Sequence, residues 1–157
     1  TSVPAFRSSV MKKILLIHGP NLNRLGERDQ EHYGTVTLSQ IEELVSGAAR
    51  KLGYTVECFQ SNHEGILIDY LKEKSEEAVG IIMNPGALSH YSYALHDAIL
   101  DTKKFCIEVH LSKIEDREPW RRVSVIAPAC IHQITGKKEQ GYAEAVELLH
   151  KELSNKL

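Results

Sequence analysis

Few features of this sequence point to nucleic acid or to a membrane. Its 157 residues include 19 basic and 21 acidic side chains, and the formal net charge is −2. Binding to nucleic acid or to an anionic membrane surface needs a basic field, which this balance does not provide. No apolar run approaches the roughly 20 residues that cross a bilayer. We therefore expect no nucleic-acid partner and no membrane partner, and instead a small molecule or another protein.

Cysteine is scarce as well. The three cysteines, Cys58, Cys106 and Cys130, are widely spaced and lie in or beside apolar runs. Their odd number and spacing argue against a disulfide framework and a zinc knuckle, and indicate buried thiols in a reducing cytoplasm. The eight histidines do not fall at the spacing of metal ligands, so we expect no metal site.

Short motifs of several enzyme classes are absent. The sequence contains no GxxxxGK[ST], no GxGxxG and no GxSxG, and His63-Glu64 lacks the second histidine of HExxH. These absences argue against a P-loop, a Rossmann dinucleotide site, a hydrolase nucleophile elbow and a zinc protease.

Length and composition favour one folded domain. With 42% hydrophobic residues, the chain is long enough for a continuous core. Residues 1–10 lack the apolar stretch of a signal peptide, and Met11-Lys12-Lys13 resembles a natural start. We expect residues 1–10 to be an added or disordered leader and residues 11–157 to be a single catalytic domain.

Short apolar runs alternate with helical patterns along the chain. The runs predict strands at residues 14–17, 54–59, 79–83, 105–111 and 124–126. Helical spacing predicts helices at residues 38–52, around 66–71, at 88–100 and at 142–153. Thr37 and Gln40 have the spacing of a capping box at the first of these helices. Alternating strands and helices predict an α/β fold, a five-stranded parallel sheet with helices on both faces.

The stretch from Ile17 to Gly34, IHGPNLNRLGERDQEHYG, is much longer than the usual connection of about 2–6 residues between a strand and a helix. We expect a functional loop that binds an anion and moves protons; a solvated surface loop is the alternative. Tyr33 can act as a base only if a nearby arginine stabilises its phenolate, and Arg24 and Arg28 are the local candidates.

Polar residues follow several of the predicted strands. In parallel sheets, ligands bind beyond the carboxyl ends of the strands. Asn21 follows the first strand, Asn84 the third, and His110 and Ser112 the fourth. The sequence therefore predicts that three separate segments deliver side chains to one edge of the sheet. Gly86 and Ala87 add amide groups ahead of a helix, which suit an anion or a hydroxyl, although a plain turn would look similar.

Two pairs of ionisable residues suggest further functional roles. Glu108 and His110 are two apart in a strand, so the carboxylate could orient the imidazole and favour its protonated form. His110 would then be a competent general acid; the alternative is a histidine satisfied at a strand end. Arg117 and Arg121 would share a helix face if residues 117–122 were helical, and an ordinary solvated basic turn is the alternative.

Five separated stretches occur in order between Lys13 and Leu149: GPNLNRLGERDQEHYG, QSNHEG, NPGALSHYSYALHDA, EVHLS with the following REPWR, and QGY. Together they resemble the motifs of the type II 3-dehydroquinate dehydratases, the dehydroquinases of the shikimate pathway of aromatic amino acid biosynthesis. The resemblance implies a flavodoxin-like three-layer fold, no metal and no cofactor. It also implies a cytoplasmic homo-oligomer, a dodecamer built from trimers.

The resemblance also implies roles for individual residues. Tyr33, paired with Arg28, would take a proton from carbon 2 of 3-dehydroquinate, Asn21 would stabilise the enolate, and His110 would protonate the departing hydroxyl. The remaining predicted site residues are Asn84, Gly86, Ala87, Leu111 and Ser112 for the substrate carboxylate, His90, Asp97 and Arg121 for the ring hydroxyls, and Glu108 and Arg117 in support. Asp97 would reach a neighbouring subunit.

The segment from Gly136 to Glu139 is more charged than the usual Gly-rich version in the resembled family, and we expect an effect on loop packing or subunit contacts. A flavodoxin-like binding module that holds a flavin or a phosphate ligand is the alternative function, because the fold permits it. The first loop lacks a Ser/Thr-rich phosphate cradle, which argues against that alternative.

Overall fold

The fold is built on a five-stranded sheet in which the three inner strands have neighbours on both sides. A computed structural model describes residues 11–156; the expected leader lies outside the described residues. The strands are β1 (Lys12–His18), β2 (Tyr54–Gln60), β3 (Ala78–Asn84), β4 (Phe105–Val109) and β5 (His132–Ile134). All pairs are parallel, and the order is β2-β1-β3-β4-β5. This is the flavodoxin-like order, so the predicted fold class is confirmed.

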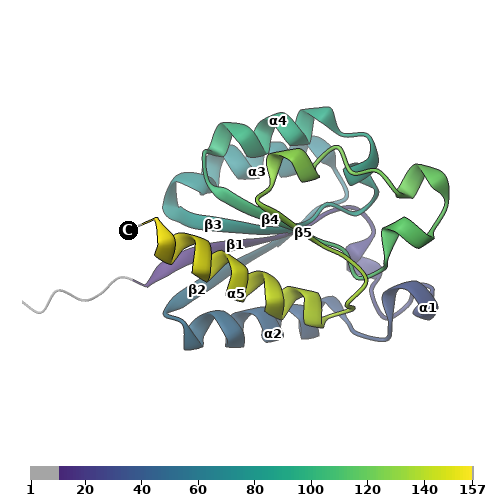
Figure 1. The fold of residues 1–157 in the computed structure, drawn as a ribbon, viewed down its shortest axis with the longest axis horizontal. Coiled ribbons are helices and arrows are strands. Elements are labelled where there is room, and N and C mark those ends of the chain that lie inside the picture. Colours follow the sequence, from purple (N-terminus) through teal and green to yellow (C-terminus); the bar gives the residue numbers. More distant parts are fainter. Residues whose placement is uncertain (1–10, 157) are drawn as a thin grey trace, which may run out of the picture.

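Four helices cover the two faces of the sheet. Figure 1 shows α3 (Glu64–Lys74) and α4 (Tyr93–Thr102) above the sheet, and α2 (Leu38–Lys51) and α5 (Gln140–Asn155) below it. A fifth, short helix, α1 (Gln30–Tyr33), lies beyond the carboxyl ends of the strands. Six 3-10 turns complete the connections: Leu22–Arg24, Ser75–Glu77, Gly86–His90, Ile114–Asp116, Pro119–Arg121 and Ala127–Ala129.

Alternate residues of β1 point into two separate cores. Ile14 and Leu16 pack in the cluster that contains side chains of α2 and α5. Leu15 and Ile17 pack in the cluster that contains side chains of α3 and α4. All four β1 side chains are fully buried. A strand buried on both faces explains why this run is continuously apolar.

The long first loop ends where the sequence predicts it to end. Thr37 Oγ1 accepts a hydrogen bond from the Gln40 amide at 3.2 Å, and Gln40 Oε1 accepts one from the Thr37 amide at 2.9 Å. Because these bonds satisfy the amides at the helix start, the predicted capping box fixes the beginning of α2.

The predicted fifth strand at residues 124–126 is wrong. The hydroxyl of Ser124 accepts hydrogen bonds from the amides of Ile126 at 3.2 Å and Ala127 at 3.0 Å. Such local bonds offer the backbone an alternative to a strand ladder, and the chain turns there instead. The fifth strand is β5, eight residues further on.

The predicted helix at residues 88–100 is interrupted. A 3-10 turn over Gly86–His90 precedes α4, which begins at Tyr93. The Ser92 hydroxyl accepts from the Leu95 amide at 3.0 Å and caps the new helix. His90 therefore lies in the 3-10 turn, and Asp97 lies in α4.

Residues 117–122 do not form the helix that would align Arg117 with Arg121. Pro119 disfavours the helical conformation at Glu118, and only the turn Pro119–Arg121 follows.

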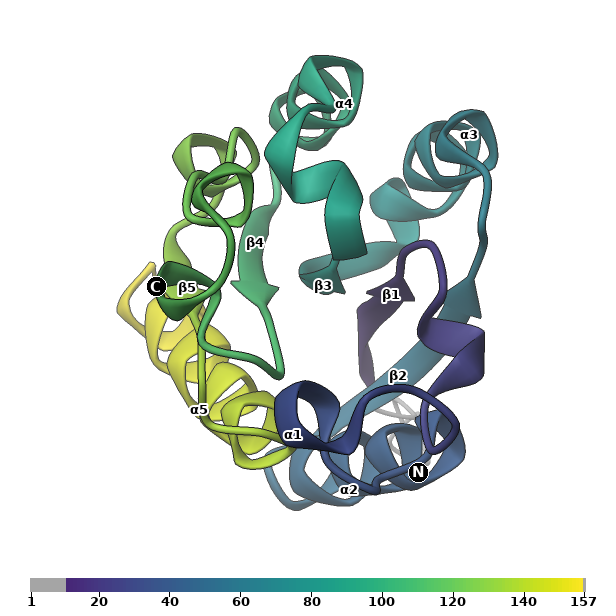
Figure 2. The same ribbon diagram turned by 90° about the vertical axis from the view of Figure 1, so that its right-hand side faces the viewer.

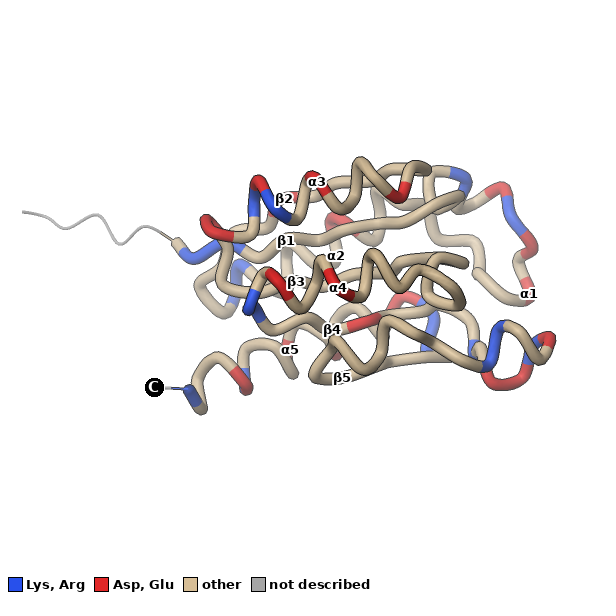
Figure 3. Tube along the Cα trace, turned by 90° about the horizontal axis from the view of Figure 1, so that it is seen from above, with Lys and Arg blue, Asp and Glu red and all other residues tan. Residues whose placement is uncertain are grey.

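Charged residues of both signs are spread over the described part of the chain. Figure 3 shows basic and acidic residues interspersed along the chain. Across residues 11–156, no helix has the length and apolar character needed to span a membrane. Cys106 is buried, Cys58 and Cys130 are half-buried, and all three thiols are free.

Candidate active site

A cavity of about 110 Å³ lies beyond the carboxyl ends of β1, β3 and β4. Figure 2 views the molecule from this end. Twelve predicted site residues line the cavity: Asn21, Arg28, Tyr33, Asn84, Gly86, Ala87, His90, His110, Leu111, Ser112, Arg117 and Arg121. Glu108 lies behind His110, and Asp97 is exposed on α4. The rule for parallel sheets therefore predicted correctly that these separate segments meet at one edge of the sheet.

Tyr33 ends the short helix α1 and turns its phenol toward two arginines. Arg28 Nη2 donates a hydrogen bond to the Tyr33 hydroxyl oxygen at 3.1 Å. Arg117 Nη1 donates to the same oxygen at 2.8 Å, and also to Ser112 Oγ at 3.4 Å. The phenol oxygen thus accepts from two guanidinium groups, and such charge-assisted hydrogen bonds are stronger than bonds between neutral groups.

The sequence alone did not identify Arg117 as a hydrogen-bond partner of Tyr33. Taken alone, the charged stretch around it favours a solvated turn. In the structure, Arg117 has an extended backbone after the turn Ile114–Asp116, and its side chain reaches the loop of Tyr33. Arg24, the other local candidate, is exposed and makes no side-chain hydrogen bond with Tyr33 among the described residues.

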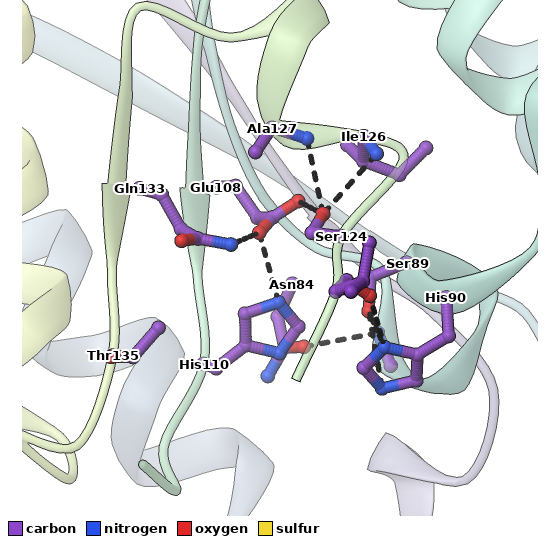
Figure 4. Close-up of polar contacts among 12 residues, drawn as sticks. Asn84, Ser89, His90, Glu108, His110, Ser124, Ile126, Ala127, Gln133 and Thr135 are labelled. Atoms are coloured by element: carbon purple, nitrogen blue, oxygen red, sulfur yellow. Dashed lines mark hydrogen bonds and ion pairs between the residues drawn. The ribbon is translucent and has the colours of Figure 1, made fainter. Parts of the chain in front are cut away.

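Glu108 is a fully buried carboxylate that receives three hydrogen bonds (Figure 4). His110 Nε2 donates to Oε2 at 3.1 Å, Gln133 Nε2 donates to the same oxygen, and Ser124 Oγ donates to Oε1 at 2.6 Å. Burial alone would raise the pKa of Glu108, but the bonds from His110, Ser124 and Gln133 outweigh it and hold that pKa below its usual value. Glu108 is therefore a charged group that can orient His110 and balance a positive imidazolium.

Ser124 and Gln133 are site residues that the sequence did not reveal. The Ser124 oxygen accepts from two amides, so its single hydrogen is directed to Glu108. Gln133 lies directly opposite Glu108 in the pairing of β4 with β5. Correct placement of β5 would have brought Gln133 beside Glu108.

Asn84 lies at the end of β3, and both polar atoms of its side-chain amide are hydrogen-bonded. Its Oδ1 accepts from the Gly86 amide at 3.0 Å, and its Nδ2 donates to the hydroxyl of Tyr142 at 3.2 Å. Tyr142 is fully buried, and burial raises the pKa of this phenol despite the bond from Asn84. Tyr142 belongs to the QGY motif, which had no assigned role; its signal was a polar aromatic residue inside an apolar helix pattern.

The loops after β1 and β3 meet at two glycines. A Cβ on Gly19 would lie 2.3 Å from the Pro85 carbonyl oxygen, and one on Gly86 would lie 2.9 Å from that of Pro20. The Gly19 amide donates to the Asn84 carbonyl oxygen at 2.7 Å. Glycine at both positions therefore permits the close approach that puts Asn21 and Asn84 in one cavity.

The QSNHEG stretch supports the turn that carries Asn21. Gln60 Nε2 donates to the Gly19 carbonyl oxygen at 3.2 Å and to Asn62 Oδ1 at 3.0 Å. Asn62 Oδ1 also accepts from the Asn21 amide at 2.9 Å, with Asn21 itself at φ 69°. In the sequence this stretch was one of the motifs that carry the family resemblance, with no contact to the first loop predicted.

His90 and Arg121 approach the cavity from another side. His90 Nδ1 donates to the Val123 carbonyl oxygen at 2.8 Å, and burial lowers the pKa of His90. The edge of its ring meets Trp120, with centroids 5.5 Å apart. Arg121 lies over the Trp120 ring and donates to Glu118 at 2.5 Å. Among the described residues, His90 Nε2 has only a long contact with the Ser89 hydroxyl, at 3.5 Å, and lies on the cavity.

Within residues 11–156, no three His, Cys, Asp or Glu side chains come together in a way that could hold a metal ion. The ionisable groups in and behind the cavity are instead two arginines on a phenol, a His–Glu pair, His90 and Arg121. Such a set can move protons and bind an anion without a metal.

Comparisons with known proteins identify the family of this chain. The family model described as "Dehydroquinase class II" matches residues 12–150. The chain is 53% identical over 137 residues to a 3-dehydroquinate dehydratase of Roseiflexus castenholzii, which covers 87% of each chain. It is 50% identical over 143 residues to a 3-dehydroquinate dehydratase of Bacillus mycoides, covering 91% of this chain and 98% of the relative.

Solved structures show the same fold. The type II dehydroquinase of Butyrivibrio crossotus superposes with a TM-score of 0.85 at 41% identity, over 88% of this chain and 97% of that one. The type II dehydroquinase of Propionibacterium acnes gives 0.85 at 35% identity, over 89% and 97%. By sequence and by fold, this chain belongs to the class II dehydroquinase family.

Proposed function

We propose that the chain removes water from 3-dehydroquinate to give 3-dehydroshikimate, as a step of the shikimate pathway of aromatic amino acid biosynthesis. The observation that carries the proposal is a phenol held by two arginines in the same cavity as a histidine backed by a buried carboxylate. One group suits proton removal and the other suits proton donation. Family membership supports the choice of substrate.

In the proposed first step, the phenolate of Tyr33 takes a proton from carbon 2 of the substrate. The electron pair of the broken bond moves toward the adjacent ketone and gives an enolate. Arg28 and Arg117 support the phenolate that does this work, and Asn21 stabilises the charge on the enolate oxygen.

In the proposed second step, the enolate re-forms the ketone and expels the hydroxyl group from carbon 1. His110 gives that hydroxyl a proton, so that it leaves as water. Glu108 keeps the imidazole oriented, because it is a hydrogen-bonded, buried carboxylate directly behind the ring. Hydrogen-bond donors meet every charge that develops, so this chemistry needs no metal and no cofactor.

We assign the substrate carboxylate to Asn84 and to the segments Gly86-Ala87 and Leu111-Ser112, which line the cavity together. His90 and Arg121 are assigned to the ring hydroxyls. Arg121 pairs with the exposed Glu118, and a ligand hydroxyl would replace or share that contact.

We further propose a cytoplasmic homo-oligomer, a dodecamer built from trimers, in which Asp97 reaches a neighbouring site. Free thiols at all three cysteines suit a reducing compartment. On α4, Asp97 shares one helix face with Tyr93 and Leu100, whose side chains are 70% and 50% exposed. Exposed apolar side chains around a polar one are typical of a subunit contact. Light scattering should give a mass well above the monomer's 17.7 kDa.

The test of the activity is direct. Addition of 3-dehydroquinate should produce the ultraviolet absorbance of a conjugated enone, and Tyr33→Phe should suppress that signal without loss of fold. A protein that produces no enone and carries a visible flavin spectrum would support the alternative, a binding module.

A further inference from the structure

The charged turn after β5 holds the end of the first loop. Lys138 Nζ donates a hydrogen bond to the backbone carbonyl oxygen of Glu31 at 2.6 Å, across 107 positions of sequence. Glu31 lies in α1, one turn of helix that ends at Tyr33. Figure 2 shows α1 beside the start of α5, which follows the turn containing Lys138.

The Glu31 carbonyl needs a partner from outside its own helix. A helix leaves its last four carbonyls without internal partners, and α1 has only four residues. The amides of Tyr33 and Gly34 donate to Asp29 at 3.0 Å and to Gln30 at 2.9 Å, so neither is available to Glu31. Lys138 supplies the donor, and its positive charge lies at the carbonyl end of the helix, where a cation is favourable.

The same turn is also bonded to the segment assigned to the substrate carboxylate. The Lys138 amide donates to the Leu111 carbonyl oxygen at 3.2 Å, and the Gly136 amide donates to that of Ser112 at 3.1 Å. The Lys138 side chain passes Gly34, with Cδ 3.8 Å from the position of a Cβ there. One residue thus links the helix of Tyr33 to the segment Leu111-Ser112.

The two lysines of the turn have different contacts. Lys137 Nζ pairs with Glu144 of α5 at 2.5 Å and makes no contact with the first loop among the described hydrogen bonds. Lys138 has φ 52°, a left-handed conformation that is unfavourable for a residue other than glycine. A lysine at this position therefore carries a conformational cost that a glycine would avoid.

We propose that Lys138 is a positioning residue for Tyr33. Its ammonium group holds α1 against the turn, so that the phenol stays within reach of Arg117. The proposal rests on the proposed role of Tyr33 as the base. It gives the charged segment from Gly136 to Glu139 a specific task in this chain.

Hydrogen–deuterium exchange of the Tyr33 and Gly34 amides tests the contact without reference to activity. In Lys138→Met, which keeps the length of the stem and loses the ammonium, exchange at both amides should rise by about two- to fivefold, the range expected for an exposed charged contact. Lys138→Arg should restore most of the protection. Lys137→Met is the matched control and should leave the exchange of both amides unchanged.

Turnover of 3-dehydroquinate tests the positioning role. Lys138→Met should lower kcat by a similar factor of about two to five, with a smaller change in KM, because the base is misplaced while the carboxylate contacts remain. Lys138→Gly removes the strain of the left-handed backbone conformation and is the second variant to test if Lys138→Met misfolds. It should show the same rise in amide exchange and the same fall in kcat.

The outcomes distinguish the contact made by Lys138 from the proposed role of Tyr33. Unchanged exchange in Lys138→Met and Lys138→Gly would overturn the proposal. Faster exchange with unchanged kcat would also overturn it, because the contact would then be structural only. If Tyr33→Phe keeps full turnover, the proposed function of Tyr33 fails separately, and the positioning role fails with it even where exchange reports the contact.

Discussion

The phenol oxygen of Tyr33 accepts a hydrogen bond at 2.8 Å from Arg117, a residue 84 positions further along the chain. Arg28, five positions away, donates to the same oxygen at 3.1 Å. The base of the proposed reaction is therefore assembled from a local and a distant guanidinium, and neither arginine alone accounts for its environment.

The two arginines should contribute separately. Arg28→Ala and Arg117→Ala should each lower kcat/KM by about 10- to 150-fold, the value of one hydrogen bond to a charged group, and the double variant should be lower still. Tyr33→Phe should abolish both turnover and hydrogen exchange at substrate carbon 2. Partial recovery of each arginine variant as the pH rises toward 10 would follow from unaided ionisation of a phenol. Carbon 2 exchange near the parent rate in Tyr33→Phe would show that the base is another residue.

His110 should act late in the reaction. His110→Ala removes the proposed proton donor and leaves the carboxylate contacts, so kcat should fall by about 10²–10⁴ while KM changes much less. Carbon 2 exchange should persist in this variant because Tyr33 is intact. A fall in kcat below tenfold would remove His110 from the role of general acid.

Through its bond to Glu108, Gln133 should affect the pH at which the protein unfolds in acid. The lowered pKa of Glu108 means that its stabilising contribution is present above the pKa of an unfolded glutamate, about 4.3, and is lost as the pH falls through the lower pKa of the folded state. Gln133→Leu should raise that pKa, move acid unfolding to higher pH and cost about 1–3 kcal/mol at pH 7. Urea unfolding from pH 3 to 7 measures both effects. In a Glu108→Gln background the cost should shrink, and an equal cost there would show that Gln133 does not act through the carboxylate.

His18 should make the fold sensitive to mild acid. Its ring is fully buried, neither ring nitrogen has a hydrogen-bond partner in the described part of the chain, and burial lowers its pKa to about 4. The unfolded chain takes up this proton near pH 6.5, so stability should fall as the pH drops from 6.5 to about 4, by roughly 2–4 kcal/mol. His18→Leu should remove this part of the pH dependence. An identical pH profile for both proteins would contradict the assignment.

The sequence predicted most of the sheet because buried strands and amphipathic helices have different apolar periods. β1 to β4, α2 and α5 lie close to their predicted positions. The fifth strand was missed because the hydroxyl of Ser124 bonds two nearby amides, which a pattern of apolar residues does not report. The break before α4 has a similar local cause in the cap formed by Ser92.

The meeting of the candidate site residues at one edge of the sheet was predictable, and the contacts among them were only partly so. Parallel strands bring their carboxyl ends to one edge, so Asn21, Asn84 and His110 could be placed together from their order alone. The contact of Glu108 with His110 could be predicted because the two residues are neighbours in sequence. Contacts made by Arg117 and Tyr142 depend on how distant loops fold back, and no local pattern encodes that distance.

The first loop leaves the ribosome long before the groups that complete it. At about 5–20 residues per second, Arg117 is synthesised several seconds after its partner Tyr33. Lys138 and Tyr142 are synthesised later still. A nascent chain stopped before α5 would hold all five strands and Arg117, but not Tyr142, which accepts the hydrogen bond from Asn84. Chemical competence in this protein is therefore among the last properties to appear during translation.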